Sequence, residues 1–195
     1  MVFMNILKTT WEEAAQRLRD GEVGVIPTDT LYGTLGSALK PSVVERVYDL
    51  RERERDKPMI TLISGWEDFE RLQIAIPDSI RSLLERVWPG PVSVVVAAPS
   101  PALRYLHRGT NSIAFRMPNK PKLRELLKAT GPMVAPSANI AGEEPALTVE
   151  DAYNYFGEEV FYLDEGKLSN PPSALVDARL EPMRILRPAP GFSLN

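Results

Sequence analysis

Residues 23–33 read VGVIPTDTLYG, a short apolar run that passes into a polar loop. The apolar part, Val23–Pro27, has the length and composition of a buried strand. A helix should follow, because Ser42 can cap it and four apolar residues between positions 43 and 50 fall on one face. The order strand, loop, helix is typical of an α/β protein whose early strands pair in parallel.

The rest of the chain extends this pattern. Thr10 and Glu13 have capping-box spacing and open a helix to about Arg19. Thr148 opens another helix in the same way, and further helices are expected at residues 66–72, 80–88 and 123–129. Short strands are expected at residues 59–63, 92–98, 112–117, 133–136, 160–163, 174–176 and 183–186. The helix-poor last third predicts some antiparallel strands. We therefore expect one α/β domain over residues 1–195, with a twisted mixed parallel/antiparallel sheet flanked by helices.

Composition excludes several kinds of site. The 195 residues include no cysteine and a single histidine, so disulfides, thiol nucleophiles and thiolate metal sites are ruled out. His107 is expected at the surface in a polar loop. No run of about 18 apolar residues and no signal-peptide pattern occurs, which predicts a cytoplasmic protein without a membrane segment.

The charges are unevenly distributed along the chain, although the net charge is only −3. No acid lies between Glu85 and Glu125, and no Lys or Arg lies between Lys128 and Lys167. This segregation predicts one basic and one acidic surface, unless folding interleaves them.

Residues 51–58 read RERERDKP, a run of alternating charge. In an extended chain its four cations would line one face and could bind a polyanion such as a triphosphate. In a helix the same residues would form i,i+3 ion pairs on a solvated surface. Pro58 disfavours a helical Lys57, so the end of the run should be extended. The charge pattern alone leaves both interpretations open.

Two polar loops follow predicted strands, where open α/β sheets place their ligand crevices. One carries Thr28, Thr30 and Tyr32, and the other carries Ser137 and Asn139. Neither a P-loop nor a dinucleotide fingerprint is present. Asp29 is expected to form a turn or a cap. Cations and neutral hydrogen-bonding groups suit phosphoryl or nucleotidyl transfer, in which the substrates supply the chemistry and the protein neutralises charge.

Seven segments, in order, resemble the YrdC-type threonylcarbamoyl-AMP synthase family. They are IPTDTLYG (26–33), RER with KPM (51–53 and 57–59), WPGPVS (88–93), AFRMP (114–118), APSANIAG (135–142), SALVD (173–177) and ILRP (185–188). The resemblance spans about residues 10–190 and implies the short, single-domain type with a large basic cleft. It implies synthesis of threonylcarbamoyl-AMP from L-threonine, bicarbonate and ATP, with Mg²⁺ as helper and pyrophosphate released. A separate threonylcarbamoyl transferase complex would use this product to modify tRNA.

The resemblance also implies roles for particular residues. Arg51, Arg53 and Lys57 should face the phosphates and carry the catalysis. The nucleotide site should further include Ser112, Ser137, Asn139 and Arg187. Threonine should be surrounded by Thr30, Tyr32, Arg116 and Ser173, with Arg116 pairing with a carboxylate. No protein metal site is expected.

Two other functions stay open at this point. The basic stretch from Arg86 to Arg124 could make the chain an RNA-binding module, for tRNA or double-stranded RNA, without turnover. A diverged relative could instead act on another carbamoyl substrate.

Overall fold

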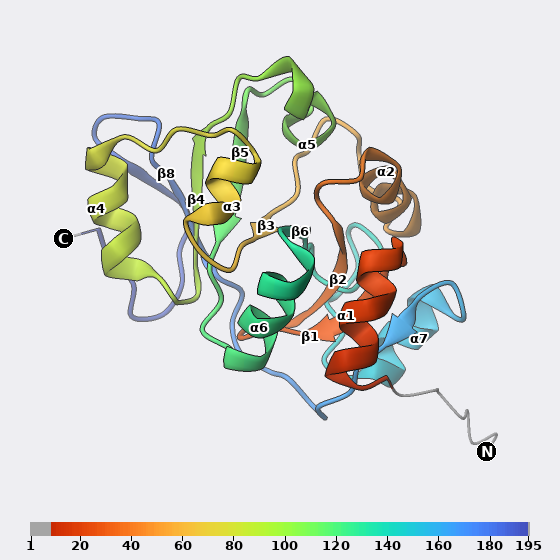
Figure 1. Cartoon of the computed structure of the whole chain (residues 1–195). Coiled ribbons are helices and arrows are strands. Elements are labelled where there is room, and N and C mark those ends of the chain that lie inside the picture. Colours follow the sequence, from red (N-terminus) through yellow and green to blue (C-terminus); the bar gives the residue numbers. More distant parts are fainter. Residues whose placement is uncertain (1–8, 195) are drawn as a thin grey trace.

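The computed structural model describes residues 9–194, and within them the strands form one mixed sheet (Figure 1). Neighbouring strands pair in parallel in β1–β7, β3–β5 and β4–β8 and antiparallel elsewhere. The predicted fold class, an α/β fold with a mixed sheet flanked by helices, is confirmed. The spatial order is β7 (Phe161–Tyr162), β1 (Gly24–Pro27), β2 (Tyr32–Ser37), β6 (Met133–Val134), β3 (Thr61–Leu62), β5 (Ser112–Arg116), β4 (Val92–Ala97), β8 (Ala174–Asp177) and β9 (Arg184–Arg187).

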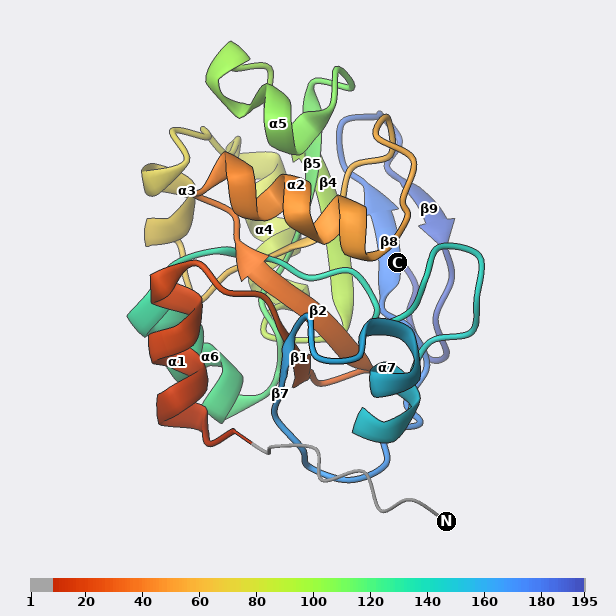
Figure 2. The ribbon, with the colours of Figure 1, turned by 90° about the vertical axis from the view of Figure 1, so that its right-hand side faces the viewer.

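The helices flank this sheet. Helix α1 lies beside α6, and α2 packs on β2, as the two views in Figures 1 and 2 both show. The helices are α1 (Trp11–Asp20), α2 (Pro41–Leu50), α3 (Glu67–Arg71), α4 (Asp78–Val87), α5 (Arg104–His107), α6 (Pro121–Thr130) and α7 (Val149–Phe156), with a 3₁₀ turn at Pro101–Leu103. Within the described residues, none of these helices has the length and apolarity needed to cross a membrane.

Local sequence signals fix several helix ends. The capping boxes at Thr10 and Thr148 are both present, as predicted. The predicted cap at Ser42 is wrong, because α2 begins at Pro41 and its N-cap residue is Lys40. Proline fits the first helical position, where no N–H donor is needed, so the helix starts two residues earlier than a cap at Ser42 would place it.

The prediction missed strand β2, and the expectation of parallel early strands fails for β1 and β2, although β3 and β5 do pair in parallel. Thr28 N donates to Leu31 O at 3.1 Å, which closes a tight turn and returns β2 antiparallel to β1. The sequence signal for a strand was weak at β2 because this segment contains glycines, which have little preference for strands. One of them, Gly36, is required by packing: a Cβ there would lie 2.7 Å from the side chain of Val43 on α2.

His107 does not lie at the surface as expected, but is buried at the end of the short helix α5, which the sequence also did not predict. Its Nε2 lies 3.2 Å from Ser100 O, and its Nδ1 accepts from Gly109 N at 3.0 Å. The backbone therefore satisfies both ring nitrogens, which is why the imidazole can leave water.

Side-chain alternation along the central strands separates the core from the site. Phe115 of β5 is fully buried and packs edge-on against Phe69 of α3, with ring centroids 4.9 Å apart. Helix α4 ends at Val87, next to the predicted end at residue 88. Trp88 then packs against Phe69, and its Nε1 donates to Val92 O at 2.7 Å. Residues that alternate with Phe115 point to the opposite face. Among them, Ala114 lies on the floor of the candidate site described below.

Candidate functional site

Two adjoining cavities lie on the sheet face opposite α3. The larger has a volume of about 390 Å³ and the smaller a volume of about 190 Å³. Both are lined by Ile60, Pro136, Ser137 and Arg187, so they meet at these residues. A bound molecule could therefore occupy one cavity and react with a second molecule in the other.

Guanidinium groups dominate the larger cavity. Arg51, Arg53, Arg179 and Arg187 all line it. Of these, only Arg179 has a carboxylate within 4.0 Å among residues 9–194. The other three cations are left with uncompensated charge, which favours an anionic occupant.

Arg51 follows α2 directly and its side chain turns into the protein. Its Nε donates to Asn139 O and its Nη2 donates to Asn139 Oδ1, both at 3.0 Å, while a longer bond reaches Ser137 Oγ at 3.4 Å. Burial, and to a lesser extent the neighbouring charge of Arg53, lowers the pKa of Arg51 to about 10. Arg51 still carries its charge at neutral pH, and no carboxylate among the described residues pairs with it.

The run at residues 51–57 is neither a helix nor an extended comb. Glu52 has a φ of +50°, and Lys57 N donates to Glu54 O, so the chain turns repeatedly. Arg53 stays in the cavity wall, where it donates to the carbonyls of Lys57 and Pro58. The predicted alignment of four cations is therefore wrong.

The last two cations of the run point elsewhere. Arg55 folds back on α2 and pairs with Glu45 and Asp49. The exposed Lys57 pairs with Glu54 at 2.7 Å and does not line either cavity. Ion pairs with these carboxylates therefore hold two of the cations that an extended run would have directed toward a ligand.

The residues predicted along the nucleotide take different places. Ser112 lies on the floor of the larger cavity, with its hydroxyl 3.1 Å from that of Thr110. Ser137 lies where the two cavities meet. Asn139 is buried and lines neither cavity; its amide donates to the carbonyls of Ile140 and Glu143. Asn139 therefore positions Arg51 rather than facing the cavity.

The smaller cavity is built around Arg116, whose side chain is only 6% exposed. It donates to Thr30 Oγ1 at 3.2 Å and to Thr28 Oγ1 at 3.4 Å, and its Nη2 lies 3.3 Å from Asp29 Oδ1. Burial lowers the pKa of Arg116, although Asp29 partly opposes this. Its Nε–H is buried and has no acceptor among the described residues.

Tyr32 and Ser173, the other two residues predicted around the small substrate, also line the smaller cavity. The Tyr32 hydroxyl donates to Gly166 O at 2.7 Å and accepts from Glu165 N, and burial raises its pKa to about 12. Ser173 Oγ lies 2.9 Å from Ser93 Oγ, and its carbonyl accepts from Arg187 Nε at 2.9 Å. Tyr32 thus braces a loop, whereas Ser173 holds Arg187 at the junction.

Two site features were missed from the sequence. Arg179 in the larger cavity carried no signal of its own, because it lies just outside the SALVD segment. Asp29 does accept a backbone N–H, from Asn119 at 2.9 Å, but its pairing with Arg116 could not be foreseen. These two residues are 87 positions apart, and only the fold brings them together.

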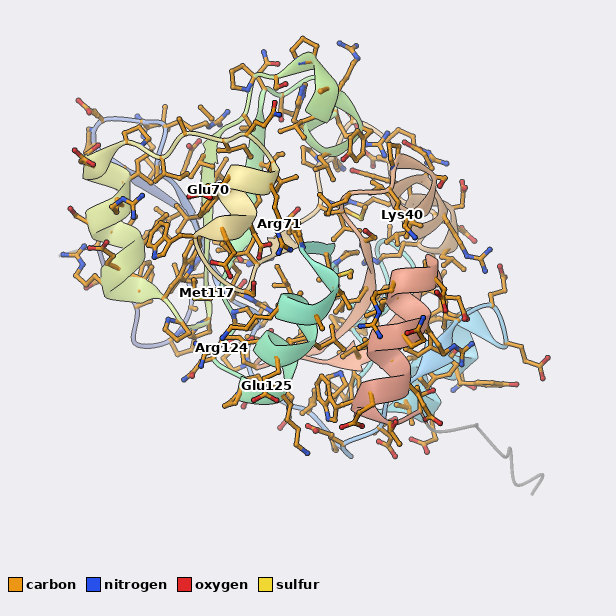
Figure 3. The ribbon with its side chains drawn as sticks, in the orientation of Figure 1. Lys40, Glu70, Arg71, Met117, Arg124 and Glu125 are labelled. Carbon is orange, nitrogen blue, oxygen red and sulfur yellow. The ribbon has the colours of Figure 1, made fainter. Side chains whose placement is uncertain are left out.

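Three cations of the basic stretch from Arg86 to Arg124 pair with carboxylates from other parts of the chain. Arg108 pairs with Glu45, Arg116 with Asp29, and Lys120 with Glu165, so folding interleaves the charges. Figure 3 shows Arg124 and Glu125 together on α6. Long-range pairing thus removes part of the segregation seen in the sequence.

The cavities do not form a metal site of their own. Among residues 9–194 no cluster of three or more His, Cys, Asp or Glu residues could hold a metal ion, and neither cavity is lined by a carboxylate. Hard cations such as Mg²⁺ prefer carboxylate and other oxygen ligands. The guanidinium groups that line the two cavities would instead bind anions.

Comparison with known proteins agrees with this geometry. The family model for Sua5, YciO and YrdC, described as "Telomere recombination", matches residues 16–189. A putative threonylcarbamoyl-AMP synthase of Mycobacterium tuberculosis is 36% identical over 180 residues, which are 91% of this chain and 82% of that protein. The threonylcarbamoyl-AMP synthase of Pyrococcus abyssi is 32% identical over 178 residues, 90% of this chain and 52% of its own length.

Solved structures give the same result. The crystal structure of P. abyssi Sua5 complexed with L-threonine has a TM-score of 0.83 at 30% identity, and the match covers 91% of this chain. The chain spans about half of that longer protein, 53%. The crystal structure of E. coli YciO has a TM-score of 0.81 at 20% identity, over 93% of this chain and 90% of YciO, which supports the fold alone.

Proposed function

This chain belongs to the Sua5/YciO/YrdC family, and from that premise we propose that it makes threonylcarbamoyl-AMP from L-threonine, bicarbonate and ATP, with release of pyrophosphate. The resemblance inferred from seven sequence segments is thereby confirmed. The proposed product would pass to a threonylcarbamoyl transferase complex for tRNA modification, so the enzyme would work in the cytoplasm beside its tRNA.

One observation carries the proposal: a cavity rich in unpaired cations adjoins a smaller one built around a buried arginine, and both include Ser137 and Arg187. A triphosphate needs the first environment and an amino-acid carboxylate needs the second. The shared residues would lie where the two substrates react. A simple phosphate-binding site would not need the second cavity.

The larger cavity would hold ATP. Arg51, Arg53 and Arg187 would neutralise the phosphate oxygens, and Ser137 would lie beside the reacting phosphate. The hydroxyl of Ser112 would contact the nucleoside. These groups are held by carbonyl and hydroxyl acceptors, so they need little reorganisation when charge develops on the leaving pyrophosphate.

The smaller cavity would hold L-threonine. The guanidinium of Arg116 lines this cavity and would bind the carboxylate, while Thr30 and Ser173 would contact the amino acid. Tyr32 would shape the cavity through its ring, because its hydroxyl is engaged by the loop at residues 164–166.

The reaction needs no protein nucleophile. The threonine amine condenses with bicarbonate to give a carbamate and water. A carbamate oxygen then attacks the α-phosphorus of ATP, a new P–O bond forms, and the bond to pyrophosphate breaks. The contribution of the protein would be to bring the two anionic substrates together and to offset their charge.

Mg²⁺ would enter as part of the MgATP substrate, held by phosphate oxygens and water. Lys57 would reach the phosphates only after leaving Glu54, with which it pairs at 2.7 Å. We retain Lys57 in the proposal as a cation recruited by the bound nucleotide.

Pyrophosphate release, measured in reactions that each lack one substrate, tests the proposal. Release should require ATP, L-threonine and bicarbonate together. Arg53→Ala should lower kcat/KM by roughly 10²–10³-fold, the cost typical of losing one preorganised charge-stabilising group. Arg55→Ala is the matched control, since Arg55 belongs to the same loop but pairs with α2; it should stay close to wild type.

Three results would contradict the proposal. Pyrophosphate release that does not depend on threonine would rule out threonine as a substrate. Wild-type activity in Arg53→Ala would rule out the role proposed for the arginines of the larger cavity. Release driven better by another amine than by threonine would indicate the diverged-substrate alternative. The named relatives give the RNA-binding alternative no support, and three cations of the basic stretch are already paired with carboxylates.

A further inference from the structure

Arg179 differs from the other arginines of the larger cavity in having an acid partner. It lies in the connection between β8 and β9, and it lines the cavity. Its Nε donates to Asp177 Oδ1 at 2.9 Å and its Nη2 donates to Asp177 Oδ2 at 2.7 Å. These hydrogen bonds lower the pKa of Asp177 and raise that of Arg179, so both groups stay charged and together.

This pairing determines what Arg179 can still offer a ligand. One edge of its guanidinium is occupied by the carboxylate, and its charge is largely neutralised. The flat face and the Nη1 group have no partner among the described residues. A guanidinium in this state is a poor phosphate ligand but a good planar surface for an aromatic ring.

The register of the strands locates Arg179 within the cavity. Ala114, Val95 and Asp177 form one row across β5, β4 and β8. Arg116 lies two residues from Ala114 along β5, about 6.6 Å away at the usual rise. Arg116 belongs to the smaller cavity, so the row at Asp177, and Arg179 beyond it, lie on the side away from the junction.

No carboxylate among the described residues lines this end of the cavity, and its wall is partly apolar. Val95 and Ala114 belong to the row at Asp177, and Ser112 lies two residues farther from the junction along β5. A wall of this kind, with one hydroxyl and no unpaired cation, suits a flat heterocycle better than a phosphate. The unpaired cations Arg51 and Arg187 contact residues 137, 139 and 173, at or near the junction.

We propose that Arg179, held flat by Asp177, is the residue against which the base of the bound nucleotide stacks, with the triphosphate running toward Arg51 and Arg187. This inference rests on the proposed function, because it assigns the base end of the same ATP site. It makes Arg179 a specificity-determining residue for an aromatic base rather than a phosphate ligand.

Equilibrium binding of ATP and of inorganic tripolyphosphate, measured by calorimetry without threonine or bicarbonate, tests the assignment. Arg179→Lys keeps a cation for Asp177 but loses the planar face, and Arg179→Ala removes both. Each should weaken ATP binding about tenfold, as expected for one lost base-stacking contact, and leave tripolyphosphate binding unchanged. Arg184→Ala is the matched control, because Arg184 is an exposed cation on β9 that does not line the cavity.

The other outcomes overturn the inference. Full ATP affinity in Arg179→Lys would show that charge alone matters, and equal losses for ATP and tripolyphosphate would make Arg179 a phosphate ligand. In either case wild-type binding of ATP would leave the proposed function standing. Failure of the wild-type protein to bind ATP at all would overturn both together.

Discussion

Asp29→Asn should destabilise the protein strongly, because it leaves the Arg116 guanidinium buried without a carboxylate. The side chains of these two residues are only 7% and 6% exposed, and Nη2 of Arg116 lies 3.3 Å from Oδ1 of Asp29. The substitution keeps the size of the side chain and an acceptor oxygen for Asn119 N. It therefore changes the charge and little else.

The magnitude follows from this geometry. At 3.3 Å the Coulomb energy of two unit charges is about 5 kcal/mol with an effective dielectric constant of about 20. Breaking a buried pair by removing one partner costs about 3–5 kcal/mol. The hydroxyls of Thr28 and Thr30 remain as acceptors for Arg116, so the lower value applies. We expect a loss of about 3 kcal/mol in unfolding free energy, and a Tm lower by roughly 6–12 °C for a chain of this size.

Urea unfolding at neutral pH and thermal melts would measure this loss. Asp56→Asn is the matched control, because Asp56 is an exposed carboxylate in the loop at residues 51–58. Saturating L-threonine should restore part of the stability of Asp29→Asn, since its carboxylate would give Arg116 a new anion. If both variants unfolded within about 0.5 kcal/mol of each other, the pair would not carry the energy assigned to it.

Two further predictions concern ion pairs near the cavities. Glu54→Gln should free Lys57 and lower the KM for ATP about twofold in the pyrophosphate assay, as expected for an exposed pair; a higher KM would rule out recruitment of Lys57. The hydrogen bonds from Arg179 lower the pKa of Asp177 in the folded state. The ionised carboxylate therefore stabilises the folded protein above the unfolded pKa of about 3.9, and this stabilisation is lost as the pH falls through the folded pKa. Urea unfolding of wild type and Asp177→Asn should therefore differ at neutral pH and converge as the carboxyl is protonated at acid pH, whereas a constant difference would contradict this.

The sequence predicted the elements whose signals are local. The capping boxes at Thr10 and Thr148, and the end of the helix expected at residues 80–88, depend on residues within a few positions of each other, and all three are found close to where they were predicted. Strand β2 was missed because its glycines carry no strand preference and are needed for contact with α2. His107 was misplaced because its partners are backbone atoms, which a residue pattern does not show.

The site residues also divide into those that the sequence identified and those whose orientation only the fold shows. The segments that resemble a known family supplied Arg51, Arg116 and Ser137, because each lies within a recognisable run of residues. The direction of each side chain depends on partners elsewhere in the chain. Lys57 is drawn to Glu54, and Asn139 turns to hold Arg51, although both were expected to face the nucleotide. Composition of a loop thus gives the chemistry available, while the fold decides which groups reach the cavity.

The partners of the cavity arginines explain how the protein keeps positive charge free for a ligand. Arg51, Arg53 and Arg187 each donate to a backbone carbonyl, which fixes the guanidinium without neutralising it. Burial lowers the pKa of Arg51 and Arg187, so holding these charges is unfavourable for the empty protein. A bound triphosphate would remove that penalty, and part of its binding free energy would come from this relief. The same fixed cations would then stabilise the charge that develops on pyrophosphate as it leaves, because the folded protein already holds them in the required orientation.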